Sequence, residues 1–155
     1  MLSEEQGQAL VRLARQEIEA RLGLRPAAAA GEDPVLGERR GVFVTLHRNR
    51  ELRGCIGSLA AVEPLAEGVR RNAINAAFHD YRFTPLTAAE LPELHIEVSV
   101  LSEPQPLITA DADDLVRRLR PGVDGVILRG PNGEQATFLP QVWQQLKRPE
   151  LFLDH

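Results

Sequence analysis

The chain has 155 residues, of which 43% are hydrophobic and 26% are charged, and this is the composition of a folded globular protein. Its formal net charge of -4 argues against nucleic acid as a partner, because phosphate-binding surfaces are usually basic. A single cysteine excludes an internal disulfide, and no apolar run reaches the roughly 18 residues that a membrane span needs. We therefore expect a cytoplasmic protein that forms one domain over residues 1–155.

A helix and a hairpin are predicted at the start of the chain. Ser3 and Gln6 form a capping-box pattern, and apolar residues at spacings of three and four continue this helix to about Leu22. A connection rich in alanine, proline and glycine follows. Residues 41–47 are typical of a strand, and the polar turn at 48–51 pairs that strand with the segment after it.

The remainder of the chain predicts further helices and strands. Pro64 starts a second helix that ends near His79. Residues 94–100 alternate apolar and polar side chains, which is typical of a strand with one buried face. After them we expect a short helix that begins with aspartates, a hairpin over residues 125–139, and a last helix from Pro140.

The segment around the single cysteine is the strongest candidate for chemistry. Cys55 lies between Gly54 and Gly57 and close to Arg53, so its backbone is permissive and a cation is near its thiol. A thiol beside a cation ionises more readily and can act as a nucleophile. The alternative is that Cys55 is a small buried residue and that the glycines relieve a close crossing of chains, as free cysteine is often buried.

Histidines could supply a base for this thiol. His47 lies on the strand before Cys55 and could approach it across the hairpin, and His79 is a second candidate. Either could equally be a surface residue. His79 and Asp80 are adjacent, but one histidine and one carboxylate do not complete a metal site. We expect no metal and no cofactor.

The loop after the second helix is the other candidate binding element. If it folds over the cysteine segment, Arg82 could receive a carboxylate or phosphate through its bidentate guanidinium group. The alternative is that Asp80 and Arg82 form an ion pair that holds the loop. Thr87 and Glu90 follow as a second capping box.

Several spaced motifs resemble those of the AMMECR domain family, whose prokaryotic members are often called AmmeMemoRadiSam system protein A. The matching segments cover most of the chain and lie at residues 52–57, 80–86, 90–91, 96–101, 121–126 and 136–140. Several motifs in one order are far more specific than any one of them.

The resemblance implies an α+β fold in which an antiparallel sheet is flanked by helices, with a smaller second lobe. It brings no agreed activity. It implies two partners in prokaryotes, a Memo-like protein and a radical S-adenosylmethionine protein, and it suggests that family chains continue beyond residue 155.

We therefore predict a binding component whose ligand or partner site is formed by Arg53, Gly54, Gly57, Asp80 and Arg82. The alternative prediction is a cysteine-dependent enzyme that acts on a small anionic substrate, with Cys55 as nucleophile and His47 as a weaker candidate for the base.

Overall fold

The computed structural model describes residues 2–27, 29–102, 106, 112–120, 125–129, 132 and 135–138. The chain divides into two compact units, which are unit 1 over residues 1–104 and unit 2 over residues 105–155. Both contain helix and antiparallel strand, so the α+β fold predicted above is confirmed.

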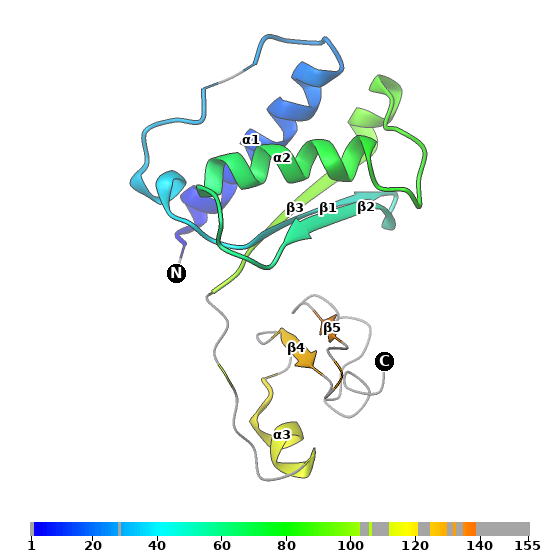
Figure 1. Ribbon diagram of the computed structural model, residues 1–155. Helices are drawn as coiled ribbons and strands as arrows, with labels where there is room; N and C mark the ends of the chain where they lie inside the picture. Colours follow the sequence, from blue (N-terminus) through cyan, green and yellow to red (C-terminus); the bar gives the residue numbers. More distant parts are fainter. Residues whose placement is uncertain are drawn as a thin grey trace. The chain divides into compact units, whose positions relative to one another are not determined.

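Unit 1 is a three-stranded antiparallel sheet covered on one face by two helices. The strands are β1 (Val42–Arg48), β2 (Glu51–Ser58) and β3 (Leu94–Val100), and their order in the sheet is β2-β1-β3. The helices are α1 (Glu4–Arg21) and α2 (Leu65–Phe78), which lie side by side on the same side of the sheet (Figure 1). Short 3-10 helices, η1 (Pro34–Gly37) and η2 (Ala88–Glu93), lie in the connections.

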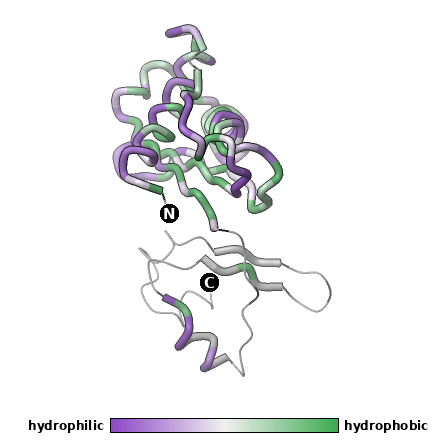
Figure 2. The backbone as a smooth tube through the Cα atoms, turned by 90° about the vertical axis from the view of Figure 1, so that its left-hand side faces the viewer, coloured by the Kyte–Doolittle hydropathy of each residue, from purple (hydrophilic) through white to green (hydrophobic). Residues whose placement is uncertain are grey.

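The two helices form where their capping residues and apolar spacing predict. Ser3 caps α1, and the reciprocal hydrogen bonds of the capping box with Gln6 are present. Hydrophobic and hydrophilic residues alternate along the tube of unit 1 (Figure 2), as expected for amphipathic elements. Their apolar faces meet the sheet in one core, formed in large part by Leu10, Ile18, Val44, Leu46, Leu65, Val69 and Ala73.

A two-residue turn joins β1 and β2, and a bulge then shifts their register. Asn49 and Arg50 both have positive φ, 52° and 68°, as such tight hairpin turns require. His47 pairs with Leu52, but Leu46 pairs with Gly54, so Arg53 is an extra residue on β2. Beyond this bulge every β2 residue faces the side opposite to the one that simple counting from the turn would give it.

This register corrects one expectation. The two glycines were expected to give the cysteine segment a permissive backbone, but the segment is regular strand β2, and neither Gly54 nor Gly57 has a positive φ. Because of the bulge, Gly54 faces α2, and Cys55 pairs with Thr45 on the face turned away from the helices.

Unit 2 contains α3 (Ala112–Arg118) and a hairpin of β4 (Val126–Arg129) and β5 (Gln135–Phe138). The predicted short helix and second hairpin are thus confirmed. Acidic Asp113 and Asp114 lie in the first turn of α3, and basic residues lie in its last turn, as the helix dipole favours. The helix predicted from Pro140 lies outside the described residues.

Candidate functional site

The two glycines of β2 are required by close packing on opposite faces of the sheet. A Cβ atom added to Gly54 would lie 2.2 Å from the carbonyl oxygen of Ala76 in α2. One added to Gly57 would lie 2.2 Å from the ring of Phe43, its partner on β1. Glycine therefore lets α2 approach one face of β2 while an aromatic ring covers the other.

The thiol of Cys55 is partly exposed and contacts a hydroxyl group. Its Sγ lies 3.2 Å from Oγ1 of Thr45, and the Thr45 residue is only 4% exposed. His47 is the next residue on the same face of β1, and its ring lies beside that of His95 on β3, with the centroids 6.5 Å apart and the planes tilted by 43°. Among the residues that the structure describes, no histidine or carboxylate is hydrogen-bonded to this thiol.

Asp80 and Arg82 hold the backbone of Cys55 from the outer edge of β2. The amide of Cys55 donates to Oδ2 of Asp80 at 3.0 Å, and Nη2 of Arg82 donates to the carbonyl of Cys55 at 3.3 Å. The two side chains also pair directly, with Nη2 to Oδ2 at 2.7 Å and Nε to Oδ1 at 2.9 Å. These side chains satisfy the outward amide and carbonyl of Cys55 as a neighbouring strand would.

The pairing also fixes the charge of Asp80. Its side chain is 1% exposed, yet the hydrogen bond from Arg82 and the amide bonds from Cys55 and Arg82 lower its pKa to about 2. The same interaction raises the pKa of Arg82. The carboxylate is therefore charged throughout the physiological range, and it is saturated by donors.

A second ion pair anchors the bulge of β2. Nε of Arg53 donates to Oε1 of Glu90 at 2.8 Å, and its Nη2 donates to the carbonyl of Thr84 at 2.7 Å. Glu90 also accepts bonds from Thr87, in the capping box that opens η2. The bond from Arg53 and those from Thr87 lower the pKa of Glu90 to about 2.

Phe83 links the two arginines. The guanidinium carbon of Arg53 lies 5.8 Å from the centre of its ring, and that of Arg82 lies 5.4 Å from it. The next residue but one toward the N-terminus, Tyr81, is instead 95% exposed. A fully exposed tyrosine thus lies on a loop whose neighbours are held by ion pairs and ring contacts.

The structure brings together most of the predicted site residues. Arg53, Gly54, Cys55 and Gly57 share one strand, and Asp80 and Arg82 close its edge. His79 caps the end of α2 and takes no part in these contacts. Sequence reasoning did not single out Thr45 or Tyr81, because the bulge hides the pairing of Thr45 with Cys55 and because exposure of Tyr81 has no sequence signal.

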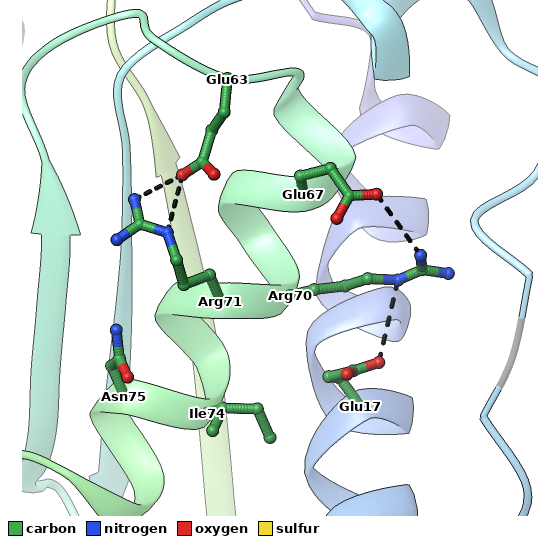
Figure 3. Close-up of a pocket in the computed structure, with 7 residues that line it drawn as sticks. All are labelled: Glu17, Glu63, Glu67, Arg70, Arg71, Ile74 and Asn75. Carbon is green, nitrogen blue, oxygen red and sulfur yellow. Dashed lines mark hydrogen bonds and ion pairs between the residues drawn. The ribbon is translucent and has the colours of Figure 1, made fainter.

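A hollow of about 420 Å³ lies elsewhere, along α2 and between it, Glu17 of α1 and Glu63 of the segment that precedes α2 (Figure 3). Arg71 pairs with Glu63, and Arg70 lies between Glu17 and Glu67. The arginines there are met by three carboxylates, so this hollow offers no surplus positive charge to an anion.

The residues that the structure describes include no cluster of three or more histidine, cysteine, aspartate or glutamate side chains able to hold a metal ion. No described helix combines the length and the apolar character needed to cross a bilayer.

Comparison with known proteins assigns the chain to a family. The family model AMMECR1 matches residues 11–155. The chain belongs to the AMMECR1 family. It is 42% identical over 144 residues to a protein of Methanothermobacter thermautotrophicus, a match that covers 91% of this chain and 74% of that protein. Protein MJ0810 of Methanocaldococcus jannaschii is 36% identical over 144 residues, with 92% and 71% covered.

A solved structure of the AMMECR1 kind confirms the architecture. The uncharacterized protein PH0010 from Pyrococcus horikoshii superposes with a TM-score of 0.84 at 38% identity, and the match covers 98% of this chain and 78% of that one. The names of these proteins state no activity.

Proposed function

We propose that this AMMECR1-family chain is a binding component that docks a partner protein on its docking loop, which we define as residues 80–84. The partners are those that the family resemblance implies, a Memo-like protein and a radical S-adenosylmethionine protein. The observation that carries the proposal is Tyr81, which is 95% exposed between two residues that are firmly held.

Tyrosine and arginine are the residue types that contribute most to protein interfaces. Tyr81 and Arg82 stand together on the docking loop, and the side chain of Arg82 is 43% exposed despite its pairing with Asp80. The side chains of Asp80 and Arg82 bond to the backbone of Cys55, and the guanidinium group of Arg53 donates to the carbonyl of Thr84, so the loop is held at both ends. Such preorganisation lowers the entropy cost of binding.

The charges of the site favour binding over catalysis. Arg53 and Arg82, which an enzyme would use to hold an anionic substrate, each meet a buried carboxylate. The thiol of Cys55 meets a threonine hydroxyl, which is a poor base. The residues of this site therefore serve mainly to hold the shape of β2 and of the docking loop.

The proposal is tested by mixing the chain with each recombinant partner from the same organism and measuring affinity by calorimetry. We expect binding that Tyr81→Ala weakens at least tenfold, as truncation of a central interface tyrosine does. Leu24→Ala is the matched control, because Leu24 is 54% exposed and follows α1. Absence of binding to both partners, or equal weakening by both variants, would refute the proposal.

The enzyme remains a second candidate because Cys55 is partly exposed and not sealed in the core. On this alternative Cys55 is the nucleophile of an enzyme that acts on a small anionic substrate. Its test is the rate at which the native thiol is alkylated, compared with the rate in the denatured chain.

A further inference from the structure

The docking loop is held at its two ends by separate ion pairs. At its start, the side chains of Asp80 and Arg82 bond to the backbone of Cys55. At its end, the carbonyl of Thr84 accepts a hydrogen bond of 2.7 Å from Nη2 of Arg53, which is a residue of β2. The position of the second half of the loop therefore depends on the orientation of the guanidinium group of Arg53.

Glu90 fixes that orientation. Nε and Nη2 of Arg53 donate to its two carboxylate oxygens at 2.8 Å and 3.3 Å, and two parallel bonds of this kind hold the plane of a guanidinium group. The third nitrogen, Nη1, is buried, and no residue in the described part of the chain accepts a hydrogen bond from it. Glu90 is thus the side chain that binds two nitrogens of this group, and Thr84 accepts from a nitrogen that Glu90 holds in place.

Glu90 can impose an orientation because its own carboxylate is fixed. Its Oε1 also accepts a bond of 3.2 Å from Nη1 of Arg48, the last residue of β1. Its Oε2 also accepts bonds from the amide and the hydroxyl of Thr87, at 2.8 Å and 3.1 Å, in the capping box of η2. The buried carboxylate therefore joins β1, β2 and η2 at one point.

Phe83 connects Arg53 to the middle of the docking loop. The guanidinium carbons of Arg53 and Arg82 lie 5.8 Å and 5.4 Å from the centre of its ring, so the ring contacts the arginine of each anchor. Phe83 is two residues after Tyr81, the exposed side chain of the loop. A change in the orientation of Arg53 would therefore disturb both the end of the loop and its middle.

We propose that Glu90 is the positioning residue of the docking loop. It orients Arg53, and through Arg53 it fixes the second half of the loop and the direction in which Tyr81 is presented to the partner. Glu90 itself lies outside the loop. This role rests on the proposed function, because the docking loop is defined there as the binding surface, but the order of the loop can be measured in the free chain.

The measurement is native-state hydrogen exchange of the full chain labelled with ¹⁵N. The amide of Phe83 donates to the carbonyl of Asp80 at 3.0 Å, so its exchange reports on local opening of the docking loop. The amide of Val69, a fully buried residue of α2, reports on unfolding of the core. A general loss of stability accelerates exchange at Val69, whereas a loss of loop positioning accelerates it at Phe83.

Two lysine variants separate the orientation of Arg53 from its charge. Arg53→Lys keeps a positive charge beside Glu90, but lysine lacks the planar fork that donates to Glu90 and to the Thr84 carbonyl together. Arg48→Lys is the matched control, because Arg48 bonds to the same carboxylate from β1. We expect exchange at Phe83 to be about tenfold faster in Arg53→Lys and unchanged in Arg48→Lys.

Two glutamine variants test Glu90 directly. Glu90→Gln keeps the size of the side chain, but its single carbonyl oxygen cannot accept parallel bonds from Nε and Nη2 of Arg53. Exchange at Phe83 should again be about tenfold faster. Glu93→Gln changes the other carboxylate that pairs with Arg48 and should leave exchange at Phe83 as in the wild-type chain.

Unchanged exchange at Phe83 in Arg53→Lys and Glu90→Gln would overturn the inference, and so would an equal acceleration in the two control variants. These results need no partner, whereas failure of the proposed function shows as absence of partner binding. For a partner that Tyr81→Ala fails to bind tightly, Glu90→Gln should weaken binding about threefold or more and Glu93→Gln should not. Equal affinities of the two glutamine variants would contradict the positioning role.

Discussion

At the scale of single residues, the glycines of β2 are the positions where one methyl group matters most. Gly54→Ala would place a Cβ atom 2.2 Å from the Ala76 carbonyl oxygen, which is backbone and cannot move aside cheaply. We expect the free energy of unfolding to fall by at least about 2 kcal/mol, because overpacking and backbone displacement add. Urea denaturation monitored by circular dichroism measures this change.

Gly7 provides the matched control for that substitution. It lies inside α1, and an added Cβ would meet nothing within 4 Å. Gly7→Ala should therefore raise the free energy of unfolding by roughly 0.5–1 kcal/mol through helix propensity. A loss of stability in Gly7→Ala, or none in Gly54→Ala, would contradict the packing described for β2.

The reactivity of Cys55 decides between the two candidate functions. We expect iodoacetamide to alkylate the native thiol at pH 7 more slowly than the thiol of the urea-denatured chain, because the native side chain is partly covered and bonded to Thr45. Mass spectrometry against time gives both rates. A native rate faster than the denatured one would show an activated thiol and would favour the enzyme.

The environment of Cys55 shows how far the sequence could predict the site. The polar residues between two apolar segments predict the turn at Asn49 and Arg50. If residues are paired one by one from this turn, Cys55 lies opposite Val44 and faces the helices. The one extra residue at Arg53 reverses this, and no pattern in the sequence marks it as a bulge. The hairpin turn was thus predictable, but the continuation of β2 through Cys55 and the face that carries the thiol were not.

At the scale of elements, two acidic residues three positions apart illustrate the difference between a buried and an exposed ion pair. Glu90→Gln leaves the guanidinium of Arg53, a residue only 9% exposed, without its compensating charge. Removing one partner of a buried pair typically costs about 3–5 kcal/mol, and we expect a loss near the lower limit because the amide still accepts hydrogen bonds. Thermal and urea unfolding both test this.

Glu93→Gln is the control for the Glu90 variant. Glu93 lies at the end of η2 and its side chain is 46% exposed where it pairs with Arg48. The expected loss is much smaller, because solvent screens exposed pairs. Equal losses in the two variants would show that the Arg53 and Glu90 pair does not anchor the bulge.

The same elements show which local features the sequence encodes. The capping boxes of Ser3 with Gln6 and of Thr87 with Glu90 were both predicted, because each depends on residues only three positions apart. The bond from Arg53 to Glu90 joins residues 37 positions apart and could not be predicted in this way. Long-range pairs follow from the register and the connections of the sheet, which local patterns do not determine.

At the scale of the whole molecule, local sequence patterns could not predict the order of the strands or the division into two units, because both depend on contacts between distant residues. The alternation over residues 94–100 predicted β3 correctly, but nothing local states that it pairs with β1 rather than with β2. Placing β1 in the centre makes β2 and β3 the outer strands of this three-stranded sheet, and side chains bind the outward backbone groups of Cys55 on β2.

The acid stability of the whole chain follows from the two buried carboxylates. Asp80 and Glu90 both have a pKa of about 2 in the fold, below their ordinary values of 3.8 and 4.5. A lowered folded pKa contributes stability that is complete above the unfolded pKa and disappears as pH falls through the folded one. We expect the free energy of unfolding to drop between about pH 4.5 and pH 2, by on the order of 2–3 kcal/mol for each group.

Comparison with Asp80→Asn isolates one of these contributions from the other acidic residues. The wild-type chain should be more stable than the variant above about pH 4, and the difference should shrink steadily as pH falls toward 2, where the wild-type carboxylate takes up a proton. Urea unfolding at pH 6, 4, 3 and 2 measures it. Glu32→Gln, which alters an exposed side chain, should give a difference that does not change with pH. A pH-independent difference for Asp80→Asn would mean that the hydrogen bonds that hold the backbone of Cys55 stabilise the fold without the charge of Asp80.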